Sequence, residues 1–278
     1  MQEWSRRLAP YLGHPVSLKR LNSAGGPGAF YVHGSREDAV LKLGIEAPEE
    51  AFYREASGSL QAAGLRVPTL LASGDNPRWV LLEYLPWSLP RKRWGRDPAA
   101  IRYLARWHAL APMVLDAGVF PSYTFRWDDN LISLDLDPSP GVLVGRFSDE
   151  LHEIFSSVGW VHGDTNVTNW RIAPDGALAL TDWARLGRAH PAIDLAILQP
   201  GLPDWDALSD LADAYCTLRP QAGPARRLAR FMALAKWWSA LDFLDMGRQG
   251  KLTADGQAGL SMLAERLPEW TQVTLGRL

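Results

Sequence analysis

The stretch from Val161 to Ala196, VHGDTNVTNWRIAPDGALALTDWARLGRAHPAIDLA, constrains the fold more than any other part of the chain. Its middle is typical of a β-hairpin, because Trp170 and Ile172 alternate with polar residues. The Pro174-Asp175-Gly176 sequence that follows is typical of a turn, since proline presets φ and glycine accepts a positive φ. Residues 177–181 then predict an apolar returning strand.

Folding this hairpin about Asp175 places Asn169 opposite Thr181. The Asn169 side chain would then lie beside Asp182 at the open end of the ribbon, at ordinary cross-strand spacing. Asp164 precedes Asn169 by five residues, on the loop that leads to the same end. We therefore expect three oxygen-bearing side chains to converge on one spot.

Such a cluster has a specific chemical use. Carboxylate and amide oxygens suit Mg²⁺, a hard cation that fills the rest of its shell with waters and phosphate oxygens. A second carboxylate that the metal does not need can orient and deprotonate a hydroxyl. The pattern therefore indicates phosphoryl transfer, in which catalysis consists mostly of positioning and charge neutralisation.

The order of HGDxxxxN, hairpin, hydrophobic-x-D-W and Asp-Leu-Ala resembles the aminoglycoside phosphotransferase / choline kinase family of small-molecule kinases. The resemblance implies an α+β, bilobal protein-kinase-like fold, with a β-rich N-lobe at residues 1–86 and a mainly α-helical C-lobe at residues 87–278. It implies ATP and Mg²⁺ as cofactors, bound between the lobes, and transfer of the γ-phosphate to a hydroxyl of a small-molecule acceptor. The acceptor stays open between an antibiotic, an amino alcohol, a sugar and a metabolite.

The resemblance also gives roles to individual residues of this block. Asp164 is expected to be the catalytic base. Asn169 and Asp182 are expected to be the metal ligands. His162 and Asp194 are expected to support the catalytic loop structurally.

Two residues depart from the family's pattern. Thr165 follows HGD where the family usually has an apolar residue. Thr181 stands where an Ile or Val usually precedes the metal-binding aspartate. Neither difference removes a catalytic group, so the predicted chemistry stands.

In the first lobe, residues 39–43 predict a strand with Lys42 inside an apolar run. Burial of an unpaired ammonium is costly, so we expect an anionic partner, although a lysine with its head in water is the alternative. The helix expected between residues 47 and 64 supplies a partner in Glu55, with Glu50 as a competitor. The Lys42–Glu55 pair would resemble the lysine–glutamate pair that holds nucleotide phosphates in kinases.

Two further segments are expected to contact the nucleotide. Gly25 and Gly26 lie in a glycine-rich turn that, in a kinase fold, covers the phosphates; a plain hairpin turn is the alternative. Residues 79–85 predict an apolar strand that ends in the hinge between the lobes. There, Glu83 and Leu85 would present backbone groups to the adenine, and the prolines that follow mark a domain boundary.

The second lobe begins with a predicted helix whose N-cap is Asp97 and whose His108 is a core histidine. An acidic interval beside Trp127 would suit a cationic acceptor, through charge and cation–π contact, with a solvated loop as the alternative. That interval contains Asp128, Asp129, Asp135 and Asp137. After Asp194 the sequence predicts helices only. One interpretation places Trp237, Trp238 and Asp242 at the cleft, and a packed bundle explains Trp237 and Trp238 as well.

Composition excludes several classes of protein. The chain has 278 residues, of which 47% are apolar and 22% charged, as in a globular protein with a full core. A net charge of −2 gives no electrostatic footprint for nucleic acid, and no run of apolar residues is long enough for a membrane span. The single cysteine, Cys216, and a first segment without a signal-like apolar core favour the cytoplasm.

Two other functions compete with a kinase. A nucleotide-binding pseudokinase with a regulatory role would share the fold, but it is disfavoured because every residue of the predicted catalytic set is present. A metal hydrolase built on His162 and Asp164 lacks further ligands at workable spacing.

Overall fold

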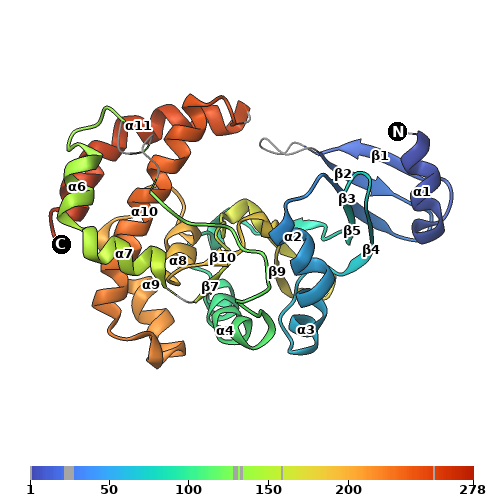
Figure 1. Cartoon of the computed structure of the whole chain (residues 1–278), viewed down its shortest axis with the longest axis horizontal. Helices are drawn as coiled ribbons and strands as arrows, with labels where there is room; N and C mark the ends of the chain where they lie inside the picture. Colours follow the sequence, from blue (N-terminus) through green and yellow to red (C-terminus); the bar gives the residue numbers. More distant parts are fainter. Residues whose placement is uncertain (1, 22–27, 128–130, 132–133, 158, 253) are drawn as a thin grey trace.

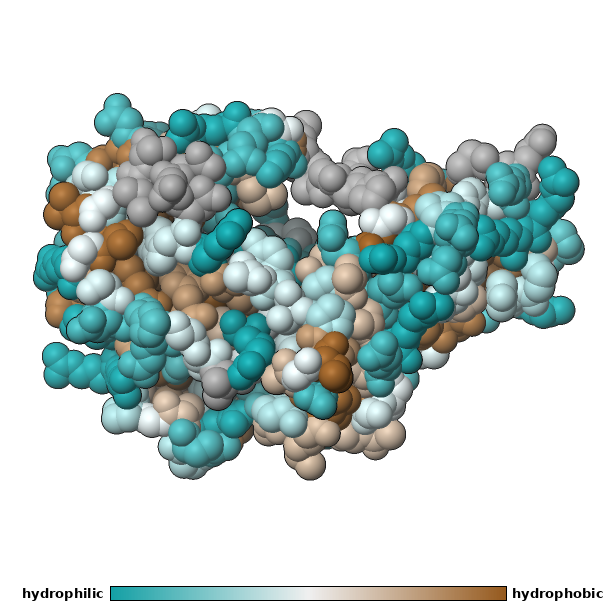
Figure 2. Space-filling model, in the orientation of Figure 1, coloured by the Kyte–Doolittle hydropathy of each residue, from teal (hydrophilic) through white to brown (hydrophobic). Residues whose placement is uncertain are grey.

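A computed structural model describes most of the chain, namely residues 2–21, 28–127, 131, 134–157, 159–252 and 254–278. An antiparallel sheet forms one end of the molecule, and helices form the other (Figure 1). The surface is hollowed between these two parts on the face that Figure 2 shows. The predicted α+β, bilobal architecture is thereby confirmed.

The sheet of the first lobe has its strands in the order β1-β2-β3-β5-β4. These strands are β1 (Ser17–Arg20), β2 (Ala29–His33), β3 (Asp38–Leu43), β4 (Leu70–Gly74) and β5 (Trp79–Glu83). Lys42, near the end of the central strand β3, lies opposite Ala29 on one side and Val80 on the other. The predicted strand at residues 39–43 is therefore present, and its lysine lies in the middle of the sheet.

The two faces of this sheet bury different side chains, because successive residues of a strand point to opposite faces. Leu41 and Leu81 belong to a small core under helix α1 (Gln2–Leu12). Val80 and Leu82 belong to the large core that continues into the second lobe. Lys42 alternates with Leu41, so it shares the face that looks toward the large core.

The helix expected between residues 47 and 64 consists of three consecutive segments. They are α2 (Ala47–Ala51), a π-helical turn (Phe52–Ala56) and α3 (Ser57–Ala62). Pro48 occupies the first turn of α2, where a missing N–H costs nothing. Gly64 follows the last segment with a φ of 79°, a left-handed conformation that glycine adopts easily.

The second lobe is mainly helical, as predicted. Its helices are α4 (Pro98–Val114), α6 (Pro140–Arg146), α7 (Ser148–Ser156), α8 (Ala192–Leu198), α9 (Trp205–Leu218), α10 (Ala225–Arg248) and α11 (Ala254–Leu275). Its short strands are β6 (Trp87–Ser88), β7 (Trp160–Val161), β8 (Trp170–Ile172), β9 (Leu178–Leu180) and β10 (Gly187–Arg188). Asp97 is the N-cap of α4, since its side chain accepts a hydrogen bond from the Ala99 N–H at 2.9 Å.

Aromatic side chains join the two lobes. The ring of Phe52, from the first lobe, stacks on that of Trp183, with centroids 3.8 Å apart and planes inclined by 11°. Trp107 of α4 meets both rings edge-on. Trp237 and Trp238 are also buried in this large core, as the bundle interpretation proposed.

The connection between the lobes is short. β6 follows directly after Pro86 and pairs with β8 of the second lobe, Ser88 lying opposite Arg171. The domain boundary at residue 86 stays a prediction that this pairing supports. None of the described helices combines the length and the apolar character of a transmembrane segment.

Candidate active site

The hairpin β8–β9 has the register that the sequence predicts. Trp170 lies opposite Leu180, so Asn169 lies opposite Thr181. Both the backbone N–H and the hydroxyl of Thr181 donate to the Asn169 carbonyl, at 2.9 and 3.0 Å. Thr181, a departure from the family's pattern, thus fixes the residue at the open end of the hairpin.

A buried carboxylate holds the catalytic loop. Asp194 is fully buried at the start of α8 and accepts hydrogen bonds from the backbone N–H groups of His162 and Gly163, both at 2.8 Å. The second departure, Thr165, donates its hydroxyl to the Asp194 carbonyl at 2.5 Å. His108 also contacts the Asp194 carboxylate, at 3.0 Å, so this predicted core histidine belongs to the same brace.

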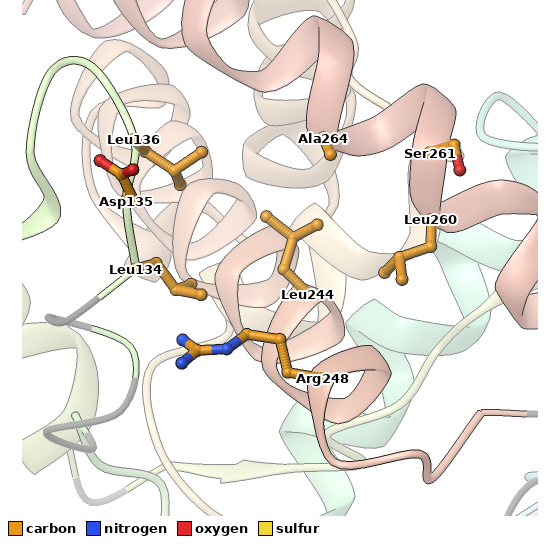
Figure 3. A pocket seen from close by; sticks show the side chains of 8 residues that line it. All are labelled: Leu134, Asp135, Leu136, Leu244, Arg248, Leu260, Ser261 and Ala264. Atoms are coloured by element: carbon orange, nitrogen blue, oxygen red, sulfur yellow. The ribbon is translucent and has the colours of Figure 1, made fainter.

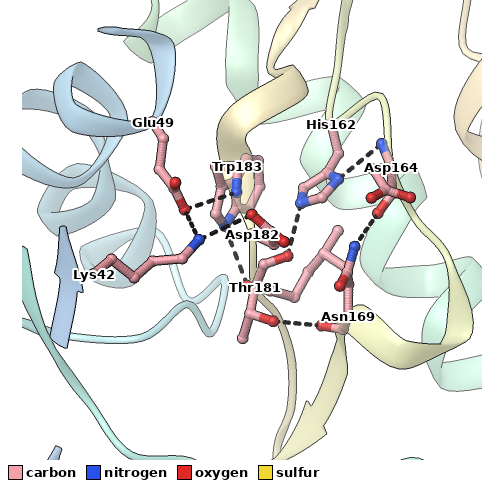
Figure 4. A network of polar contacts seen from close by, with 9 residues as sticks. Lys42, Glu49, His162, Asp164, Asn169, Thr181, Asp182 and Trp183 are labelled. Atoms are coloured by element: carbon pink, nitrogen blue, oxygen red, sulfur yellow. Dashed lines mark hydrogen bonds and ion pairs between the residues drawn. The ribbon is translucent and has the colours of Figure 1, made fainter. Parts of the chain in front are cut away.

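His162 lies between the loop and the hairpin (Figure 4). Its Nδ1 accepts from the Asp164 N–H at 3.2 Å, which leaves Nε2 to donate to the Thr181 carbonyl at 3.1 Å. Burial lowers the pKa of His162 to about 4. The ring is therefore neutral near pH 7, and its contacts suit a positioning role better than that of a base.

Asp164 has the environment of a general base. Its backbone carbonyl accepts from the Asn169 amide at 2.8 Å, which ties the loop to the hairpin. Burial raises the pKa of Asp164 to about 6, while the nearby Arg185 guanidinium opposes that rise. A carboxyl with a pKa just below neutral is ionised at pH 7 yet basic enough to take a proton from a hydroxyl.

Lys42 contacts two carboxylates from different lobes. Its ammonium lies 2.5 Å from Glu49 Oε1 and 2.9 Å from Asp182 Oδ1 (Figure 4). Glu49 also accepts from the Trp183 N–H at 3.3 Å. Burial alone would lower the pKa of Lys42, but the two carboxylates raise it, so the side chain stays charged.

The predicted partner of Lys42 is therefore wrong. Glu55 is exposed on the outer side of the π-helical turn, and Glu50 pairs with Arg54 and Arg78 instead. Glu49 lies three and four residues before Phe52 and Tyr53, on the buried stripe of the helix. This spacing was a readable signal, because residues three and four apart share a helix face.

Asp182 and Asn169 fit a hard cation. Asp182 adopts a left-handed conformation, with φ 67° and ψ 70°, and its side chain is 49% exposed. Lys42 lowers the pKa of this carboxyl, so it is ionised at neutral pH. With the Asn169 amide nitrogen bonded to Asp164, the amide oxygen has no donor among the described residues. An ionised carboxylate and a free amide oxygen are ligands of the kind that Mg²⁺ takes from proteins.

The other expected nucleotide contacts are less complete. Gly25 and Gly26 lie outside the described residues. The Glu83 side chain turns away to Arg66 and to the Thr69 N–H, and these contacts lower its pKa although burial alone would raise it. The Leu85 N–H donates to no described residue, so it is free to meet a ligand acceptor.

A polar cavity of about 390 Å³ lies in the second lobe. It is lined by Tyr123, Thr124, Arg126, Leu131, Trp238 and Asp242. Asp242 forms an ion pair with Arg185 at 3.0 Å, and Arg185 follows the Asp182-Trp183 pair by two residues. The sequence analysis considered Asp242 but missed Arg185. Its signal was a positive charge three residues after Asp182, the predicted metal ligand.

A second cavity, of about 450 Å³, is mainly apolar (Figure 3). Its lining comes from residues 134–136, the end of α10 and α11, and includes Leu134, Leu136, Leu244 and Arg248. Asp135 lines this cavity as well, whereas Asp128 and Asp129 lie outside the described residues. Trp127 packs against Phe155 and Trp237, so it belongs to the core more than to a binding rim.

Comparison with known proteins agrees with this geometry. Residues 17–231 match the phosphotransferase enzyme family. The matched range covers the sheet, the hairpin, the catalytic loop and most of the helical lobe. The chain belongs to this family. The predicted family and the predicted class of enzyme, a small-molecule kinase, are thereby confirmed. A search of curated protein sequences gives no significant match.

Solved structures of small-molecule kinases share the fold. A microcompartment-associated aminopropanol kinase superposes with a TM-score of 0.66 at 13% identity, over 96% of this phosphotransferase and 95% of that chain. A choline kinase from Cryptosporidium parvum gives 0.65 at 10% identity, over 98% and 95%. A macrolide 2′-phosphotransferase from Brachybacterium faecium gives 0.60 at 15% identity, over 95% and 98%. The protein-kinase-like fold is therefore confirmed.

Proposed function

We propose that this phosphotransferase uses ATP with Mg²⁺ and transfers the γ-phosphate to a hydroxyl of a small molecule. The observation that carries the proposal is the convergence of Lys42, Asp182, Asn169 and Asp164 at the open end of one hairpin. It joins a cation, two candidate metal ligands and a carboxyl of raised pKa at the junction of the two lobes. That combination suits phosphoryl transfer.

Each side chain then has a defined task. Lys42, held by Glu49, binds the oxygens of the nucleotide phosphates. Asp182 and Asn169 would hold Mg²⁺, which neutralises phosphate charge when bound. The Leu85 N–H would meet the adenine edge. His162 and Asp194 keep the loop in place while the reaction proceeds.

Asp164 handles the proton. It accepts the proton of the acceptor hydroxyl as that oxygen forms a bond to the γ-phosphorus. The bond between the γ-phosphorus and the β–γ bridging oxygen breaks in the same transfer. The products are the phosphorylated acceptor and ADP, and the proton leaves Asp164 to solvent afterwards.

The nature of the acceptor follows less directly. The structural relatives are named for aminopropanol, choline and macrolides, and these molecules share a hydroxyl. A hydroxyl-bearing small molecule is accordingly the proposed partner of this chain. A panel of hydroxyl compounds, scored for ADP formation with Mg²⁺ and ATP, would identify the class.

The sharpest test of the proposal is Asp164→Asn. This change removes the base but keeps the shape of the side chain, so turnover should fall by ~100-fold or more. Binding of ATP with Mg²⁺, measured by calorimetry, should stay nearly the same because Asp164 faces the acceptor. Turnover within about tenfold of the unmodified enzyme would refute the assignment. Nucleotide binding without ADP formation from any acceptor would instead support the pseudokinase alternative.

A further inference from the structure

The two charged side chains that line the polar cavity, Arg126 and Asp242, differ in whether they have an ion-pair partner. Arg185 donates through Nη1 to Asp242, so these two groups neutralise each other. Arg126 is exposed, lines the same cavity and has no described carboxylate within ion-pair distance. Among the described residues that line the cavity, Arg126 is therefore the charged side chain without an ion-pair partner.

Arg185 also has unused donors. Its guanidinium lies over the rings of Tyr123 and Trp238, 5.0 and 5.5 Å from their centroids. Its Nε and Nη2 atoms are buried and have no hydrogen-bond partner among the described residues. Buried donors without an acceptor are costly, so a ligand oxygen that reached these donors would relieve an existing deficit.

This arginine lies directly beside the catalytic base. Gly163 precedes Asp164, and a Cβ on Gly163 would lie 3.1 Å from the Cβ of Arg185 and 2.4 Å from its carbonyl oxygen. The backbone of Arg185 therefore packs against the residue before Asp164, and the Arg185 guanidinium is close enough to act on the Asp164 carboxyl. One small molecule could reach both.

Resting on the proposed function, we infer that the acceptor carries a carboxylate as well as the hydroxyl that is phosphorylated. Arg126 and the free edge of Arg185 bind the carboxylate, while Asp164 takes the hydroxyl proton. A guanidinium fork matches the two oxygens of a carboxylate. A carboxylate would pair with Arg126, whereas a phosphate dianion would bring a second negative charge close to Asp164 and Asp242.

This inference opposes the sequence-based hypothesis of a cationic acceptor. That hypothesis depends on four aspartates, of which Asp128 and Asp129 lie outside the described residues, Asp135 lines the separate apolar cavity and Asp137 is exposed. It also depends on Trp127, whose ring packs against the core. Both ideas place the acceptor on the same side of the cleft. They differ only in the sign of its charge, so one experiment separates them.

The experiment compares matched acceptors: 3-hydroxypropanoate, propane-1,3-diol and 3-aminopropan-1-ol, with the same three charges repeated on longer skeletons. ADP formation is followed with Mg²⁺ and ATP. The hydroxy acids should have the highest kcat/KM in each set. Arg126→Gln should raise KM for the hydroxy acid about 10-fold or more, the effect of losing a charge-assisted hydrogen bond, and leave KM for the diol unchanged.

Two further variants make the result specific. Arg126→Lys should recover part of the loss, because it keeps the charge without the fork. Arg102→Gln, a matched change at an exposed position of α4 outside the cavity lining, should alter none of the constants.

The outcomes separate the two proposals. Preference for the amino alcohols would overturn the carboxylate inference and leave the proposed function standing. A KM for the hydroxy acid that is unchanged in Arg126→Gln would do the same. ADP formation that none of the compounds stimulates would also overturn the inference. Absence of ADP under every condition would remove both proposals.

Discussion

Lys42 balances two carboxylates that come from different lobes. Glu49 reaches it from the first turn of α2, and Asp182 from the end of the hairpin. Glu49 is almost fully buried, and burial raises its pKa although Lys42 opposes the rise. Removing the lysine would leave that carboxyl buried without its partner.

Lys42→Met and Glu49→Gln should therefore be non-additive in kcat/KM for ATP. Either change removes the same ion pair, so the double variant should lose little more than the worse single variant. Glu55→Gln is the matched control and should have no effect, because Glu55 is exposed. A double variant whose loss equals the sum of the single losses would contradict the pairing.

The pH dependence of turnover follows from Asp164. Its pKa is raised to about 6 by burial, and only the ionised carboxylate accepts a proton. The value of kcat/KM for the acceptor should be level above pH about 6 and fall as pH drops below it. Arg185→Gln should move this acid limb to higher pH, since the guanidinium opposes the rise in pKa. A pH profile that is unchanged in Arg185→Gln would show that the Arg185 guanidinium does not affect the pKa of Asp164.

At the scale of single elements, glycine geometry sets the catalytic loop. Gly163 has a φ of 79°, and a Cβ there would lie 2.4 Å from the Arg185 carbonyl and 2.6 Å from the Phe125 ring. Gly176, in the hairpin turn, has a similar φ of 83° but open space around it. A side chain at Gly176 would therefore meet backbone strain alone, whereas a side chain at Gly163 would meet the same strain and steric overlap.

Gly176→Ala should destabilise the protein by about 1–2 kcal/mol, the cost of a left-handed conformation with a side chain. Gly163→Ala should cost clearly more, because it adds overlap with backbone that cannot move away easily. Urea unfolding would measure the loss of unfolding free energy in both variants, provided that the dependence of this free energy on urea concentration is unchanged. Equal losses for the two variants would show that the loop accommodates the methyl group.

How far the sequence predicts these elements depends on the range of the interactions. The hairpin register could be predicted because the turn and the alternation are local to residues 169–182. Position in mid-helix was the wrong criterion for the partner of Lys42. Glu49 in the first turn could be read from its spacing to Phe52 and Tyr53, whereas Glu55 lies in the π-helical turn Phe52–Ala56, where the regular helical period is broken. The role of Arg185 depends on Tyr123, Trp238 and Asp242, which only the tertiary fold brings together.

At the scale of the whole molecule, the predicted site spans both lobes. Lys42 belongs to the sheet and Asp182 to the helical lobe, so a ligand bound at both would hold the lobes together. The predicted division into lobes followed from the family resemblance and from the prolines after residue 85. The proposal on the acceptor's class needed the lining and the charges of a cavity.

ATP with Mg²⁺ should therefore raise the thermal midpoint of the protein. A ligand at 100 times its Kd stabilises the folded state by about 2.7 kcal/mol. Asp182→Ala should abolish the Mg²⁺-dependent part of this shift, because it removes the main charge that opposes the cation. Asp135→Ala, in the separate apolar cavity, is the control and should keep the shift. An undiminished shift in Asp182→Ala would exclude the metal role.

The hydrophobic cluster that passes from Phe52 to Trp183 without interruption has a consequence for how the chain can be divided. The connection at residues 86–88 is exposed and would tolerate a cut. Each fragment, however, would expose to water the apolar side chains that the other fragment covers in the intact protein. The two fragments would be expected to aggregate when made separately and to reassemble when made together, which makes this chain a natural candidate for a split-protein reporter.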